Sequence, residues 1–154
     1  MFLTVHATAA IIVTQQVVNP WLAFLIGFLS HFVLDAIPHG DEDLFKHADG
    51  RIKMRVLIIT ALIDLLLALI WFNFLWQQEK ITSLWPAVFA AFGSMLPDFL
   101  TGFYLITRSP WLKWIYHLNS HIVHRLIIKK PVPTAIGLTI QGLFFLVLIL
   151  YLFL

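Results

Sequence analysis

One stretch of this chain, from Thr134 to Leu154, contains no charged residue. A helix needs about 20 consecutive apolar residues to cross the hydrocarbon core of a bilayer, and this stretch meets that length. Hydrocarbon offers no partners to exposed backbone groups, so a single crossing stretch must satisfy its own hydrogen bonds as a helix. The stretch therefore predicts an integral membrane protein.

Four further apolar stretches precede this one, and the composition agrees with them. Hydrophobic residues make up 60% of the 154 positions and charged residues only 12%. We therefore expect one integral membrane domain over residues 1–154, an all-α bundle of about five transmembrane helices. The first stretch is the weakest because it is short and carries polar side chains. Asn19 followed by Pro20 predicts a helix start for the second stretch, with Asn19 as its N-cap. The four stretches are Phe2 to Val18, Trp21 to Ile37, Val56 to Trp76 and Leu84 to Ile106.

The basic residues fall almost entirely on one predicted side of the membrane. If all five stretches cross, nine of the ten lysines and arginines share a side with the amino terminus, and only Lys80 lies opposite. Because positive charge is retained in the cytoplasm, we expect the amino terminus there. This bias explains the basic residues without a nucleic-acid partner. The nine residues are Lys46, Arg51, Lys53, Arg55, Arg108, Lys113, Arg125, Lys129 and Lys130.

A histidine and an aspartate lie four residues apart near the end of the second stretch. On a helix, His31 and Asp35 would share one face, and His39 follows closely in the chain. Imidazole nitrogen and carboxylate oxygen together suit zinc, manganese or iron, so the pair is a candidate half-site for a divalent metal. The alternative is that Asp35 only orients His31 within a packed bundle.

A faint internal repeat relates the second and fourth stretches. A shift of 66 residues aligns Pro20 with Pro86 and Gly27 with Gly93. Such a repeat would place Asp98, near the end of the fourth stretch, at the depth of the histidine and aspartate just described. The alignment is short enough to arise by chance.

Three more polar residues lie inside or beside the apolar stretches. Asp98 follows Pro97, which should break the last part of the fourth stretch, and it is either a ligand or a helix-end residue at the membrane surface. His6 enters the first stretch at the same predicted level. Asp64 lies deeper, within the third stretch, where a carboxylate normally faces the bundle interior. Its alternatives are a metal ligand, a partner of a ligating histidine, or a protonated acid.

The segment from Trp111 to Ile127 predicts an amphipathic helix lying at the membrane interface. His117, His121 and His124 fall on one narrow arc of this helix, and Arg125 follows them. The arc is either part of a metal site or a solvated polar face.

Eight of these polar residues, all except the deeper Asp64 and the basic Arg125, come from four separate segments, yet the topology places them all on the cytoplasmic side. The eight are His6, His31, Asp35, His39, Asp98, His117, His121 and His124. That agreement predicts a shared site for a divalent metal, zinc first, with manganese or iron as alternatives. We expect Asp64, His124 and Arg125 to act as a base, as support for a ligand or as a phosphate-binding group. The expected metal ligands are His6, His31, Asp35, His39, Asp98, His117 and His121.

The motifs resemble those of the LexA-binding, inner-membrane-associated hydrolases, also described as membrane-bound metal-dependent hydrolases. The shared features are an early histidine at His6, a Ser-His-x-x-x-Asp helix from Ser30 to Asp35, and Leu-Pro-Asp ending at Asp98. The segment from His117 to His121 is similar to the family's paired-histidine motif. The order differs, because here the Ser-His-x-x-x-Asp motif precedes Leu-Pro-Asp. The resemblance implies a metal-dependent hydrolase.

A second resemblance is to the seven-span zinc amidases of the alkaline ceramidase and adiponectin-receptor type. Ser30, Asp35 or Asp98, and the pair His117/His121 match the residue types of that site. Five spans do not match seven, so this resemblance ranks lower.

The predicted function is metal-dependent hydrolysis of a lipid or lipid-linked ester, phosphoester or amide at the cytoplasmic face. Membrane lipids are the expected partners, with a lipid-like substrate. Two alternatives remain, an ion or metal transporter and a non-catalytic membrane scaffold. A transporter would use Asp64 on its ion path, and so small a chain would then need to form a homo-oligomer.

Overall fold

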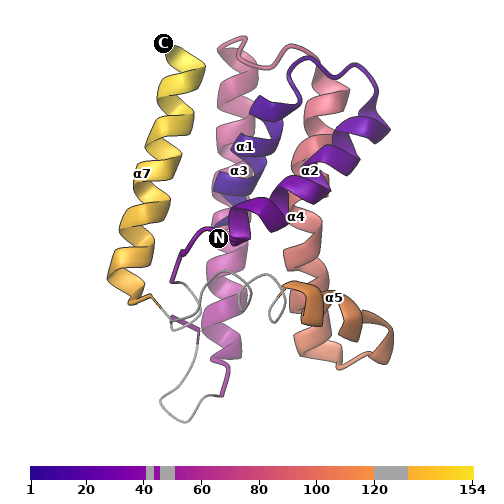
Figure 1. Cartoon of the computed structure of the whole chain (residues 1–154), viewed down its shortest axis with the longest axis vertical. Helices are drawn as coiled ribbons and strands as arrows, with labels where there is room; N and C mark the ends of the chain where they lie inside the picture. The colour runs from indigo at the N-terminus through magenta and orange to yellow at the C-terminus, as the bar shows by residue number, and fades with distance from the viewer. Residues whose placement is uncertain (41–43, 46–50, 120–131) are drawn as a thin grey trace.

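The computed structural model describes residues 1–40, 44–45, 51–119 and 132–154, and every regular element in these ranges is a helix (Figure 1). Four helices run through the first two thirds of the chain, a short turn and helix follow them, and the last helix closes the described part. The elements are α1 (Leu3–Val13), α2 (Pro20–Asp35), α3 (Met54–Gln77), α4 (Leu84–Thr107), the 3₁₀ turn η1 (Pro110–Leu112), α5 (Lys113–His117) and α7 (Thr134–Phe153).

Three of these helices, α3, α4 and α7, are long and apolar enough to cross a membrane. Large apolar side chains such as Leu62, Leu66 and Ile70 point outward from α3, as lipid-facing residues should. The prediction of an all-α fold is therefore confirmed, and these three helices are compatible with an integral membrane protein. Helices α1 and α2 are apolar but shorter than 18 residues, so the count of five spans stays a prediction.

Helix α1 forms the centre of the bundle. It contacts α2, α3, α4 and α7, and nearly all of its residues from Leu3 to Ile11 are buried (Figure 1). The helix is apolar on all sides, which is the pattern of a helix surrounded by others. Its polar Thr8 is also paired, because the Trp71 indole of α3 donates a 3.0 Å hydrogen bond to the Thr8 hydroxyl. The weakest predicted stretch is thus the core of the fold.

The start of α1 lies against the middle of α3, and side chains from two other helices bind its first backbone N–H groups. Gln141 of α7 accepts from the nitrogen of Phe2 at 3.0 Å. Asp64 of α3 accepts from the nitrogens of Leu3 and Thr4 and from the Thr4 hydroxyl. A helix leaves its first N–H groups without partners, and in a buried apolar setting these groups require acceptors. Gln141 and Asp64 supply them.

Helices α2 and α4 cross at two glycines, and the contact is reciprocal. A Cβ atom added to Gly27 would lie 2.2 Å from the carbonyl oxygen of Ala90, and one added to Gly93 would lie 2.4 Å from that of Phe24. The shift of 66 residues that aligns Gly27 with Gly93 also aligns Phe24 with Ala90, so the two contacts are equivalent. The internal repeat therefore coincides with a close helix crossing of the kind that small residues permit in membranes.

The ends of these helices follow local sequence signals, with one exception. The side chain of Asn19 accepts from the nitrogens of Trp21 and Leu22, and Pro20 occupies the first turn, as predicted for the start of α2. Pro97 does not break α4, which continues to Thr107. Packing against α1 and α2 outweighs the loss of one backbone hydrogen bond at the proline.

Candidate metal centre

Two histidines from different helices meet at the centre of the bundle. His6 of α1 and His31 of α2 are both fully buried, and their rings stack with centroids 4.3 Å apart. The glycine crossing of α2 with α4, together with the contacts that fix α1, brings these helices close enough for the two rings to touch.

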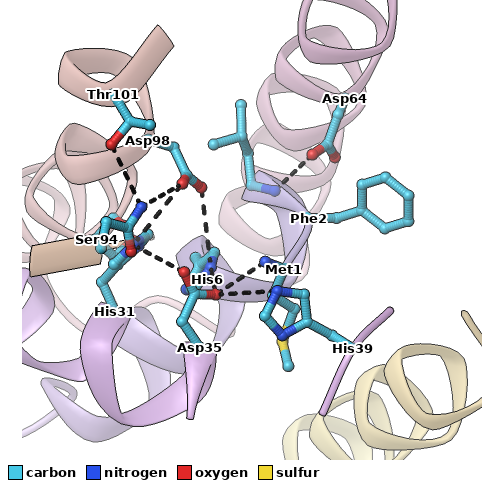
Figure 2. A network of polar contacts seen from close by, with 12 residues as sticks. Met1, Phe2, His6, His31, Asp35, His39, Asp64, Ser94, Asp98 and Thr101 are labelled. Carbon is cyan, nitrogen blue, oxygen red and sulfur yellow. Dashed lines mark hydrogen bonds and ion pairs between the residues drawn. The ribbon is translucent and has the colours of Figure 1, made fainter. Parts of the chain in front are cut away.

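Two carboxylates complete the group (Figure 2). One oxygen of Asp35 lies 3.2 Å from His6 Nε2 and the other lies 3.2 Å from His31 Nε2. Asp98 of α4 lies 4.0 Å from His6 Nε2 through one oxygen and 3.8 Å from His31 Nε2 through the other. The Met1 nitrogen also donates to Asp35 at 2.8 Å. Four residues predicted as metal ligands therefore converge on one point.

The distances suit a small divalent cation. Ligand atoms of His6, His31 and Asp98 all lie within 4.8 Å of one another. In a tetrahedral zinc site, ligands at the usual bond length are about 3.3 Å apart. The histidine-to-carboxylate distances of 3.2–4.0 Å bracket that value, so modest side-chain adjustment would form a coordination shell.

Backbone carbonyl groups determine that Nδ1 is protonated in two histidines. His31 Nδ1 lies 2.8 Å from the carbonyl oxygen of Ser94, and His39 Nδ1 lies 2.7 Å from that of Ile37. A carbonyl oxygen only accepts, so each Nδ1 carries a proton. His31 Nε2 in turn faces two acceptor oxygens, those of Asp35 and Asn119, so it also donates here and would have to release that proton to bind a metal. Both Nε2 atoms face Asp35. Metal-binding histidines commonly use this arrangement, with one nitrogen donating to a carbonyl and the other free to ligate.

The ring of His6 carries the clearest sign that something is to be bound. Both of its nitrogens are buried, and neither has a hydrogen-bond partner among the described residues. The 3.2 Å approach of Nε2 to Asp35 is close without hydrogen-bond geometry. A buried polar group without a partner costs about 1–3 kcal/mol, so a native structure normally supplies one. Coordination of a cation through His6 would remove that cost.

Asn119 is a residue of the site that the sequence analysis missed. Its amide nitrogen lies within donating distance of Asp98 Oδ1 (3.3 Å) and Thr101 Oγ1 (3.4 Å), and its amide oxygen lies 3.2 Å from His31 Nε2. It is two residues from both His117 and His121, so on a helix it faces the side opposite to the histidine arc that drew attention. A buried amide between a histidine and a carboxylate positions both.

Three predicted residues have clear positions in the structure outside this first group. His39 is buried and places Nε2 3.8 Å from Asp35, at the edge of the cluster. His117 is exposed at the end of α5 and its ring contacts that of Tyr116, so it does not join the group. Asp64 holds the start of α1, which supports a positioning role, while its assignment as a catalytic residue stays a prediction.

The remaining predicted residues, His121, His124 and Arg125, lie outside the described residues. The predicted interfacial helix is described only at its start, as η1 and α5.

No family model matches the chain, and comparison with curated proteins and with solved structures finds no match either. The resemblance to the LexA-binding hydrolases therefore stays a prediction carried by short motifs. The geometry of the cluster is independent of it.

Proposed function

We propose that this protein is a membrane-embedded, metal-dependent hydrolase that cleaves an ester, phosphoester or amide. The observation that carries the proposal is that Asp35 and Asp98 both lie within 4.0 Å of the Nε2 atoms of His6 and His31, while His6 has no hydrogen-bond partner among the described residues. Such a set of two imidazoles and two carboxylates fits zinc best, with manganese or iron as alternatives.

Each residue of the proposed site has a defined task. His6 and His31 supply imidazole ligands, and the Ser94 carbonyl holds the second ring in its ligating tautomer. Asp35 and Asp98 supply anionic oxygens that balance the charge of a cation within the bundle. A divalent metal bound here would supply Lewis-acid activation of water and of the scissile bond.

Two of these side chains also face the space from which a substrate would come. Asp98 is 29% exposed whereas Asp35 is 2% exposed, and both line a cavity beside α3 and α4. His39 lines the same cavity, and because its Nδ1 donates to the Ile37 carbonyl, Nε2 is the nitrogen that faces the site. We assign His39 as the group that accepts a proton from the attacking water.

The proposal includes the membrane arrangement. We place α1 and α2 within the bilayer, beside the three long helices, because the outer face of α2 exposes Leu25, Leu29 and Val33. The five helices then present the cluster toward the cytoplasmic side of a bacterial inner membrane, with the amino terminus on that side. The basic residues of the loops support this orientation.

Elemental analysis together with a hydrolysis screen tests the proposal. Protein purified in detergent without a histidine tag should hold close to one divalent metal per chain. It should also cleave at least one of three chromogenic probes, a p-nitrophenyl ester, phosphoester or anilide, in a reaction that chelation stops and metal restores. His31→Ala should lose both properties.

A matched histidine control is available at the end of α5. His117→Ala should keep its metal and its activity, because His117 does not join the cluster. Metal-free native protein after reconstitution with zinc, manganese and iron would overturn the proposal. Equal metal content in folded His31→Ala would do the same.

A further inference from the structure

A large cavity opens from the candidate metal centre along the inner faces of α3 and α4. Its volume is about 520 Å³, within the range of roughly 300–1,000 Å³ that small-molecule sites occupy. Asp35, Asp98, His39 and Asn119 line one part of it. The cavity therefore includes Asp35, Asp98 and His39 of the proposed reaction, whereas His6 and His31 are not among its lining residues.

Most of the remaining lining is apolar and comes from the two long helices. Leu57, Ala61 and Leu65 line it from α3, and Phe99, Gly102 and Leu105 line it from α4. A small polar metabolite would gain nothing from these walls, because its own polar groups would lose water without replacement. The lining is suited to a molecule with one polar end and a long apolar part.

The cavity also opens sideways toward the lipid. Ile58 and Leu62 of α3, and Phe103 and Ile106 of α4, line it and are themselves exposed on the outer surface of the helices. These helices are two of the three long enough to span a bilayer, so their exposed faces contact hydrocarbon. An apolar chain could pass from the bilayer into the cavity without crossing water.

The volume argues against a protein partner as the occupant. A helix with its side chains is about 10–12 Å wide, so 520 Å³ would hold only roughly four residues of one. A flexible hydrocarbon chain fits a long, irregular space of this size.

We propose that the cavity is the binding site for the acyl chain of a single-chain amphiphilic lipid, whose scissile group lies at Asp98 and the histidine pair. This inference rests on the proposed hydrolase function and adds to it the substrate class and the route of entry. The lipid enters laterally between α3 and α4, with its chain along Ala61 and Gly102 and its polar end at the metal centre.

Gly102 gives a direct way to close the cavity. A Cβ atom added there meets nothing within 4 Å, so a large side chain can enter the open space without striking backbone. Gly142 of α7 has the same open surroundings and does not line the cavity. Gly102→Trp and Gly142→Trp therefore form a matched pair, and Ala61→Phe offers a second, independent block from the opposite wall.

The test measures binding of 1-palmitoyl lysophosphatidylcholine by native mass spectrometry of the detergent-purified protein, with metal content measured on the same samples. Wild-type protein and Gly142→Trp should each retain one lysolipid in a saturable manner. Gly102→Trp and Ala61→Phe should bind it at least about tenfold more weakly while keeping their metal. Thermal unfolding of each variant shows that it is folded.

The outcomes separate this inference from the function on which it rests. Equal lysolipid retention in all folded variants, or unsaturable binding, would overturn the lipid site and leave a metal-containing hydrolase in place. Absence of metal from every sample, with selective loss of lysolipid in the two blocked variants, would overturn the hydrolase and leave a lipid-binding cavity. Normal metal content with selective loss of lysolipid supports both.

Discussion

The imidazole rings of His6 and His31 stack with an interplanar angle of 22°, although 25 positions separate the two residues in the chain. Asp35 contacts both rings, one with each of its carboxylate oxygens. Because both ring edges and both oxygens point to one place, the pair acts as a single unit toward any bound cation.

The first prediction concerns the link between metal and stability. A ligand that binds only the folded state stabilises it, by about 2.7 kcal/mol when its concentration is 100 times Kd. Chelation should therefore lower the thermal midpoint of the wild-type protein by several degrees. In His6→Leu, which removes two buried nitrogens that have no hydrogen-bond partner among the described residues, chelation should leave the midpoint unchanged. A midpoint that shifts equally in both proteins would contradict a role for His6 as a ligand.

Asn119 should tune the affinity for metal without supplying a ligand. Its amide contacts His31 and Asp98, so its removal leaves both free to turn away from the metal. Loss of such a supporting contact typically weakens metal affinity roughly 10- to 100-fold. Competition with a metal-binding dye should show this decrease in Asn119→Ala. Ser109→Ala, at a half-buried position before η1, should keep the wild-type affinity, and an unchanged Asn119→Ala would exclude the supporting role.

Metal affinity should decrease as the pH falls. Histidine ligands must be neutral to bind, so protons compete with the metal below the ordinary imidazole pKa of about 6.5. Equilibrium dialysis at several pH values should show tighter binding at pH 8 than at pH 5.5, with protons released on binding. An affinity independent of pH over this range would argue against coordination by His6 and His31.

How far the sequence could predict this site depends on how far apart the partners lie. His31 and Asp35 are four residues apart on one helix, and their spacing alone predicts that they share a face. The positive-inside pattern added His6 and Asp98 to the same level, and the structure brings these residues together. Gln141 and Asn119 act only through contacts with distant helices, so their roles required the fold.

The fold, like the site, has features that the sequence predicts and one that it does not. The apolar stretches predicted the three long helices, and Asn19 with Pro20 predicted the start of α2. Burial of the weak first stretch at the centre was not predictable, because polar residues such as His6 and Thr8 reduce its apparent tendency to be buried. The hydrogen bond from Trp71 explains why Thr8 is tolerated there, whereas His6 has only the 3.2 Å approach of Nε2 to Asp35.

Asp64 should contribute to stability through the start of α1. Asp64→Leu leaves the nitrogens of Leu3 and Thr4 and the Thr4 hydroxyl without their acceptor, at about 1–3 kcal/mol for each unsatisfied group. Thermal unfolding in detergent should show a large decrease in the midpoint. Asp64→Asn keeps one acceptor oxygen and should lose less. Metal content that disappears in folded Asp64→Asn would instead identify Asp64 as a ligand.

The reciprocal glycine crossing gives a prediction with an internal control. Gly27→Ala and Gly93→Ala each place a Cβ against backbone of the opposite helix, so both should destabilise the protein and separate α2 from α4. Gly142→Ala has open space and should gain up to about 1 kcal/mol from helix propensity. Thermal unfolding midpoints of the three variants test this prediction, and a stabilised Gly27→Ala would contradict the close crossing.

The hydrogen bond from the Phe2 nitrogen to Gln141 joins residues 139 positions apart. During synthesis, α1 leaves the ribosome long before α7. The N–H of Phe2 therefore lacks its Gln141 acceptor until α7 has been made. The central helix therefore reaches its final state only after α7 has been inserted beside it. The start of α1 thus acquires its last acceptor from the final helix, and a chain that ends before α7 should be less stable than the full chain because the Phe2 N–H lacks that acceptor.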